Sequence, residues 1–133
     1  MLHDVLAAYL VDIEHSIAGI ENAYVELYEE EIFSGNRANL RIRIRFDSGN
    51  LLEINEAVAV TEDKIRSLQY RYHFQDKNNT LVFRYDNTPH YPDLEKFPHH
   101  KHVPRNVCPT DKITISSVID EAVRLIDDMS DNG

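Results

Sequence analysis

The chain has 133 residues, which is enough for one domain with a hydrophobic core and too few to expect a second domain. Hydrophobic residues make up 42% of it, and its apolar runs are too short for a transmembrane helix, so we expect an ordered protein without a membrane span. The single cysteine excludes an internal disulfide, and the first residues lack the basic and apolar regions of a signal peptide. We therefore expect a cytoplasmic protein.

The net charge of −9 is unevenly distributed along the chain. Residues 1–36 carry a net charge of −8 and residues 113–133 carry −4, whereas residues 37–112 carry +3. A locally basic surface can contact phosphate groups even when the whole protein is acidic. The charge therefore leaves a nucleic-acid ligand open, and a solvated surface of mixed charge is the alternative.

The predicted secondary structure begins with a helix. Apolar residues recur at intervals of three and four in residues 1–17, as expected for an amphipathic helix, and Gly19 marks its end. Residues 22–86 alternate with period two, most regularly in LRIRIRF, and turn sequences such as SGNRAN, DSGN and DKNN separate the runs. Short turns between consecutive strands predict an antiparallel meander of about five strands.

The rest of the chain is predicted to be a loop followed by a helix. Residues 87–112 are rich in histidine and proline and hold one short strand, KHVPRNVC, which Pro104 restricts to an edge of the sheet. Residues 114–129 have the apolar stripe of a second amphipathic helix. We predict a single α+β domain over residues 1–133, with the N-terminal and C-terminal helices packed on one antiparallel sheet.

One predicted strand carries three basic residues on the same face. In LRIRIRF the period of two places their guanidinium groups about 7 Å apart along the strand: Arg41, Arg43 and Arg45. This face is a candidate for binding RNA phosphates, and Arg71 and Arg84 extend it if the two hairpins lie side by side. The alternative is a solvated strand face whose arginines pair with Glu26 or Glu53 on neighbouring strands.

The stretch RYDNTPHYPDLEKFPHHKHVP, residues 84–104, holds four of the seven histidines: His90, His99, His100 and His102. Imidazole accepts and donates a proton near neutral pH, which is the chemistry that RNA cleavage without a metal requires. We interpret these four histidines as candidate acids and bases, with Asp86 orienting one of them. Arg84 and Lys101 are candidate ligands of the phosphate. In an extended segment His100 and His102 share one face, and His99 shares the other with Lys101.

Two other interpretations of this stretch stay open. Three or four histidines can bind zinc, but no cysteine pair and no HExxH helix accompanies them, so we predict no metal and no cofactor. Prolines and histidines can also form a rigid loop whose imidazoles only cap backbone groups. Tyr85 and Tyr91 flank the histidines and are candidates for stacking on a ligand, whereas Tyr70 and Tyr72 are expected in the core.

Three motifs in the second half of the chain resemble the TumE family, small prokaryotic proteins that are the toxin half of a toxin–antitoxin pair. The motifs are YRYHFQD, FRYDNTPH and FPHHKH, all within the run YRYHFQDKNNTLVFRYDNTPHYPDLEKFPHHKHV. After the first PH, members of the family often have a second histidine where this chain has Tyr91. The resemblance implies a type II toxin with a cognate antitoxin of the DNA-binding helix-turn-helix type.

The order of a helix followed by an antiparallel meander is also similar to the layout of RelE-type and barnase-like ribonucleases. From the histidines and the family resemblance together, we predict a toxin that acts as a metal-independent endoribonuclease, with RNA and an antitoxin as partners. A homodimer is one option for its assembly. The alternatives are a non-enzymatic module that binds nucleic acid or protein, and a zinc-dependent nuclease.

Overall fold

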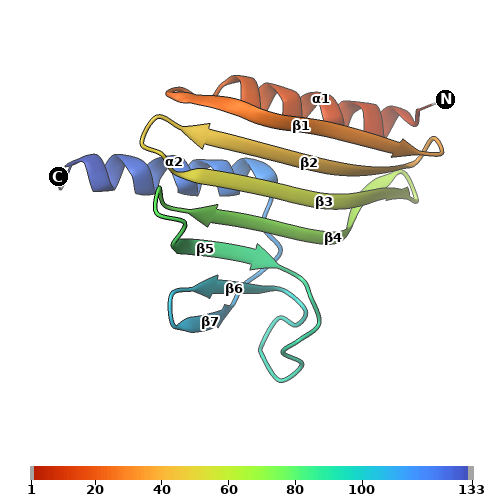
Figure 1. Cartoon of the computed structure of the whole chain (residues 1–133). Helices are drawn as coiled ribbons and strands as arrows, with labels where there is room; N and C mark the ends of the chain where they lie inside the picture. The colour runs from red at the N-terminus through yellow and green to blue at the C-terminus, as the bar shows by residue number, and fades with distance from the viewer. Residues whose placement is uncertain (1, 132–133) are drawn as a thin grey trace.

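The computed structural model describes residues 2–131, which form two helices and one sheet (Figure 1). The helices are α1 (Asp4–Ala18) and α2 (Ile115–Asp131). The strands, in chain order, are β1 (Ala23–Phe33), β2 (Arg37–Phe46), β3 (Leu51–Thr61), β4 (Lys64–Gln75), β5 (Leu81–Asp86), β6 (His100–Val103) and β7 (Asn106–Pro109). No helix within these residues has the length and apolar character needed to cross a membrane.

The seven strands form one antiparallel meander, in which each strand pairs with the next strand along the chain. The α+β class and the two terminal helices are confirmed, but the prediction of about five strands was too low. The segment expected to hold one edge strand folds instead into the hairpin of β6 and β7. Pro104 lies in the turn of this hairpin, where it does not have to donate a backbone hydrogen bond, so the residues on both sides of it can pair.

Both helices lie on the same side of the sheet (Figure 1), where they contact β3 and β4. The alternation in β2 explains this arrangement, because its apolar side chains are buried: Leu40, Ile42, Ile44 and Phe46. The apolar stripe of α1 covers them with Leu6, Leu10, Ile13 and Ile17. Tyr70 and Tyr72 are 2% and 0% exposed, which confirms their predicted place in the core. We call the other face of the sheet, which the helices do not cover, the open face.

A buried carboxylate fastens the helices to the sheet. The Glu56 side chain is fully buried on the helix side of β3 and accepts hydrogen bonds from the hydroxyls of Tyr9 in α1 and Tyr72 in β4. The Ser67 hydroxyl donates to it at 3.1 Å, and the Lys112 ammonium, just before α2, lies 3.7 Å away. Because a buried charge is stable only when it is paired and hydrogen-bonded, these contacts fix α1 and the entry to α2 against the sheet.

Candidate functional site

Cross-strand pairing brings two of the predicted histidines next to the predicted aspartate. In the ladder between β5 and β6, Asp86 pairs with His100 and Arg84 pairs with His102. Because side chains alternate along a strand, these four lie together on the open face. We call them the histidine cluster. Its members come from segments on either side of a long loop, so the cluster forms only when that loop returns the chain to β5.

His100 is the buried member of the histidine cluster, with 2% of its surface exposed. Its Nε2 lies 2.7 Å from Asp86 Oδ1, and its Nδ1 lies 3.0 Å from the Pro98 carbonyl oxygen. Both ring nitrogens therefore face oxygen acceptors, and both can donate only in the imidazolium form. The backbone amide of Thr88 also donates to Asp86 Oδ1, at 3.1 Å. The result is a buried hydrogen-bonded contact between His100 and Asp86 that is held in a fixed geometry.

His102 is the more exposed imidazole of the pair, with 15% of its side chain accessible. Its Nε2 lies 3.5 Å from Asp86 Oδ2, the same oxygen that accepts a hydrogen bond from Arg84 Nε at 3.3 Å. Burial lowers the pKa of His102 below 6.5, and the charge of Arg84 lowers it further, whereas Asp86 raises it. The neutral form, which can accept a proton, is therefore favoured near neutral pH.

Tyr91 covers the outer side of the histidine cluster. Its ring meets those of His100 and His102 edge to face, with centroids 5.1 Å and 6.0 Å away. Tyr91 is 39% exposed, so it can contact another molecule. His90 lies beside Tyr91, 6.4 Å between ring centroids, and is exposed. The structure therefore places Tyr91 on the cluster and leaves His90 outside it.

Three other predicted site residues lie on the helix side of the sheet. The Lys101 ammonium donates to Glu121 Oε2 at 2.9 Å, and the Tyr85 hydroxyl donates to Glu121 Oε1 at 2.5 Å. His99 Nδ1 lies 2.8 Å from the Tyr70 hydroxyl, and the two rings are stacked. The structure does not bring these residues to the histidine cluster. The sheet separates them from it, as expected for neighbours along a strand.

Three members of the histidine cluster are candidate metal ligands: Asp86, His100 and His102. Each offers one ligand atom, and these atoms lie within 4.8 Å of one another. Their present contacts do not fit this use well. Asp86 already accepts from His100, Thr88 and the Arg84 guanidinium. A metal ion would have to displace the His100 hydrogen bond and approach next to a permanent positive charge.

Three of the four arginines of β2 were predicted as a phosphate-binding row, and on the open face each of these three is paired with a glutamate. Arg41 pairs with Glu29 at 3.5 Å, and Arg45 with Glu26 at 3.2 Å. Arg43 lies between two acids, 3.6 Å from Glu26 and 3.4 Å from Glu53. The pairs with Glu26 and Glu53 are those that the alternative interpretation of the strand expected, and the pair with Glu29 is an additional one. Exposed ion pairs are weak, so the arginines remain able to exchange partners.

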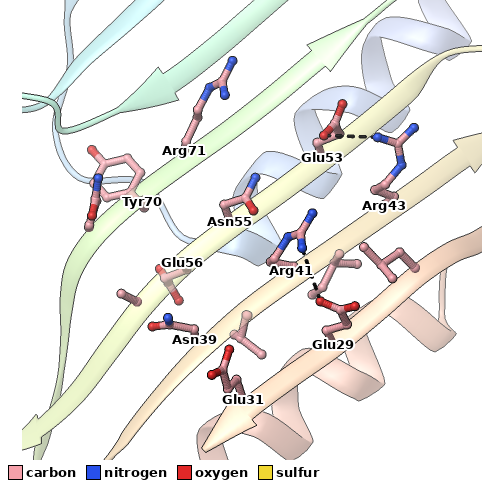
Figure 2. Close-up of a pocket in the computed structure, with 15 residues that line it drawn as sticks. Glu29, Glu31, Asn39, Arg41, Arg43, Glu53, Asn55, Glu56, Tyr70 and Arg71 are labelled. Atoms are coloured by element: carbon pink, nitrogen blue, oxygen red, sulfur yellow. Dashed lines mark ion pairs between the residues drawn. The ribbon is translucent and has the colours of Figure 1, made fainter. Parts of the chain in front are cut away.

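A groove of about 550 Å³ lies on the open face between β1 and β4 (Figure 2). Arg41 and Arg43 from β2, Asn55 from β3 and Arg71 from β4 line it, with their side chains directed away from the helices. Arg71, at the β4 side of the groove, pairs across the strands with Asp86 on β5. The groove and the histidine cluster therefore lie next to each other on one face, and Arg71 stands between them.

Two residues of this region were not assigned to the site itself: His73 was not predicted, and Arg71 was expected only as an extension of the basic strand face. The alternation in YRYHF could have identified both, because Tyr70 and Tyr72 in the core place their neighbours on the open face. His73 pairs with Arg84 in the ladder, and its Nδ1 is a buried atom with no hydrogen-bond partner among residues 2–131. Burial is the main cause that lowers its pKa. Its place beside Arg84 depends on strand register, which local spacing does not give.

The fold and the site define a class of protein: an α+β meander with a histidine–aspartate–arginine cluster beside a groove on its uncovered sheet face. The chain matches the family model described as Toxin TumE over residues 13–131, and it therefore belongs to the TumE family. The predicted family is thus confirmed. The family name is that of a toxin, which implies an antitoxin as its partner. No curated protein and no solved structure matches the chain.

Proposed function

We propose that this protein is the toxin of a type II toxin–antitoxin pair and that it cleaves RNA by histidine acid/base chemistry without a metal. The observation that carries the proposal is the histidine cluster, in which a partly exposed imidazole is held by a buried carboxylate. Asp86 contacts both His100 and His102 and so fixes the orientation of both rings. Arg84, at the same carboxylate, supplies a positive charge for a phosphate.

The proposed reaction is transfer of the phosphate within the RNA strand. The base takes the proton of the 2′-hydroxyl, whose oxygen attacks the phosphorus. The bond from phosphorus to the 5′-oxygen breaks, and the acid gives its proton to that oxygen, which leaves a 2′,3′-cyclic phosphate and a 5′-hydroxyl. His102 is the proposed base because its neutral form is favoured. His100 is the proposed acid, and to give its proton to the leaving oxygen it exchanges the Nε2 contact with Asp86 for that oxygen.

The test is cleavage of single-stranded RNA by the purified protein in EDTA, between about pH 5 and pH 8, the range in which histidines titrate. We expect fragments that end in a cyclic phosphate, and we expect His102→Ala to lower the rate by about 10²–10⁴-fold. His15→Ala, an exposed histidine of α1, is the matched control and should leave the rate unchanged. Absence of cleavage by the unmodified protein across this range would contradict the proposal.

A non-enzymatic binding module is the second candidate, and the ion pairs of the open face favour it. Because Arg41, Arg43 and Arg45 are already paired with glutamates, the face is less cationic than its arginines alone indicate. Growth arrest separates the two candidates. Arrest that persists in His102→Ala, with unchanged binding of the cognate antitoxin, would favour the binding module.

A further inference from the structure

The groove on the open face is aligned with the histidine cluster through the ladder of the sheet. Arg41 on β2 pairs with Asn55 on β3, which pairs with Arg71 on β4. Arg71 pairs in turn with Asp86, and Asp86 with His100. One row of cross-strand neighbours therefore leads from the groove into the cluster. A ligand that crosses the strands along this row contacts both.

A small side chain lies between two longer ones in this groove. In the next row, Asn39 on β2 pairs with Ala57 on β3, which pairs with Gln69 on β4. The methyl group of Ala57 lies between two longer amide side chains, so it leaves a hollow between them. All three residues line the groove. The carboxamides of Asn39 and Gln69, together with Asn55, supply both donors and acceptors around the hollow.

The charges in the groove nearly cancel, because the two exposed charged side chains that have no ion pair among residues 2–131, Arg71 and Glu31, have opposite signs. Arg41 is paired with Glu29, and Arg43 with Glu53. Arg71 is exposed, and no ion pair involving it occurs among residues 2–131. Paired charges and carboxamides suit an uncharged group with hydrogen-bonding edges, such as a nucleobase. The unpaired guanidinium suits a phosphate.

We propose that the groove is a binding subsite for one unpaired nucleotide of single-stranded RNA, next to the cleaved bond. The base occupies the hollow over Ala57, between Asn39 and Gln69, and its phosphate lies on Arg71. Adjacent strands are about 4.8 Å apart, so β3 and β5 are separated by about 10 Å, and a nucleotide with its phosphate crosses that distance. This inference rests on the proposed nuclease function and gives it a substrate class.

Single-stranded RNA fits this subsite better than a duplex for a chemical reason. In a duplex the Watson–Crick edges are paired, whereas a splayed base can present its edge to carboxamides. The hollow lies over one alanine and therefore admits one base at a time. The subsite contributes to the binding of oligonucleotides that extend beyond the cleaved dinucleotide, and it contributes nothing to a dinucleotide itself.

The experiment measures binding of 2′-O-methyl oligonucleotides, which cannot be cleaved, by fluorescence anisotropy. The probes are a single-stranded tetranucleotide of mixed sequence, a dinucleotide and a duplex. We expect the unmodified protein to bind the tetranucleotide more tightly than the dinucleotide. Ala57→Leu fills the hollow and should remove about tenfold of that affinity, in keeping with the contribution of one bound base. Arg71→Ala should weaken the tetranucleotide and leave the dinucleotide unchanged.

Ala59→Leu is the matched control, because Ala59 lies on the same strand and face but outside the groove. It should bind like the unmodified protein, and melting curves will show that both variants fold. Equal binding by Ala57→Leu and Ala59→Leu overturns the inference. So does a loss in Ala57→Leu of antitoxin binding alone, which would assign the groove to a protein partner. Failure of the nuclease proposal is visible separately, as RNA that stays intact with the unmodified protein. The binding comparison then still shows whether the groove binds a nucleotide.

Discussion

At the scale of single residues, His100 and His102 show how burial separates two neighbouring histidines of one motif. His100 is enclosed with its hydrogen-bond partner Asp86, whereas His102 is partly open to solvent. Removing the His100 ring leaves the buried Asp86 carboxylate without one of its hydrogen-bond donors. We expect His100→Ala to lower the free energy of unfolding by about 1–3 kcal/mol. We expect His102→Ala to change it by less than about 1 kcal/mol.

Urea denaturation of the two variants at pH 7 checks this difference. If His102→Ala were as destabilising as His100→Ala, a loss of cleavage in it would only report unfolding. Asp86→Asn is the companion variant. It keeps the size of the side chain but removes the charge that His100 faces, so it should lose stability as His100→Ala does.

At the scale of elements, α1 is fixed to the sheet through its apolar stripe and through one polar contact. The Tyr9 hydroxyl donates to the buried Glu56 carboxylate. A hydrogen bond to a buried charged group contributes about 1.5–3 kcal/mol, so we expect Tyr9→Phe to lower the free energy of unfolding by that amount. The matched control is Tyr28→Phe, because the Tyr28 hydroxyl donates to the exposed carboxylate of Glu30.

The control should cost less than about 0.5 kcal/mol, since water replaces an exposed partner. Urea denaturation measures both variants, and hydrogen exchange of the α1 amides shows whether this helix loosens first. Similar losses in Tyr9→Phe and Tyr28→Phe would mean that the buried carboxylate does not fasten α1.

Local sequence patterns predicted the elements where turn residues and periodicity agree. The helix ending at Gly19 and the strand LRIRIRF are examples. The turn between β3 and β4 has no such signal, because Glu62 and Asp63 adopt the left-handed conformation, at φ 53° and 61°, without a glycine or asparagine. The β6–β7 hairpin was missed for a related reason, since Pro104 indicates both an edge strand and a turn.

Only the part of the candidate site that depends on the alternation of side chains within one strand could be predicted from the sequence. This alternation predicted that His100 and His102 share a face and that His99 and Lys101 lie on the other, and the structure has this arrangement. It could not show that Asp86 lies opposite His100, because register across a long loop depends on the path of that loop. The roles of these residues in catalysis stay predictions.

At the scale of the whole molecule, three histidines on the two faces of the sheet couple stability to pH in the same direction. Burial is the first cause that lowers the pKa of His73, His99 and His102 below 6.5. Arg84 adds to it at His73 and His102, and Lys112 at His99. In each case the folded protein favours the neutral imidazole.

The unfolded chain, with histidine pKa values near 6.5, therefore binds more protons than the folded protein as the pH falls below that value. The free energy of unfolding is expected to be highest above pH 6.5 and to decrease as the pH falls through 6.5 and on toward the lower pKa values of the folded state. Urea denaturation at pH 7.5, 6.5 and 5.5 measures this dependence in a range where most carboxylates stay ionised. His73→Gln, which cannot titrate, should make the dependence shallower, whereas His15→Gln on the exposed face of α1 should not. A stability that is constant or rises toward pH 5.5 would contradict the expectation that the folded protein favours the neutral form of these three imidazoles.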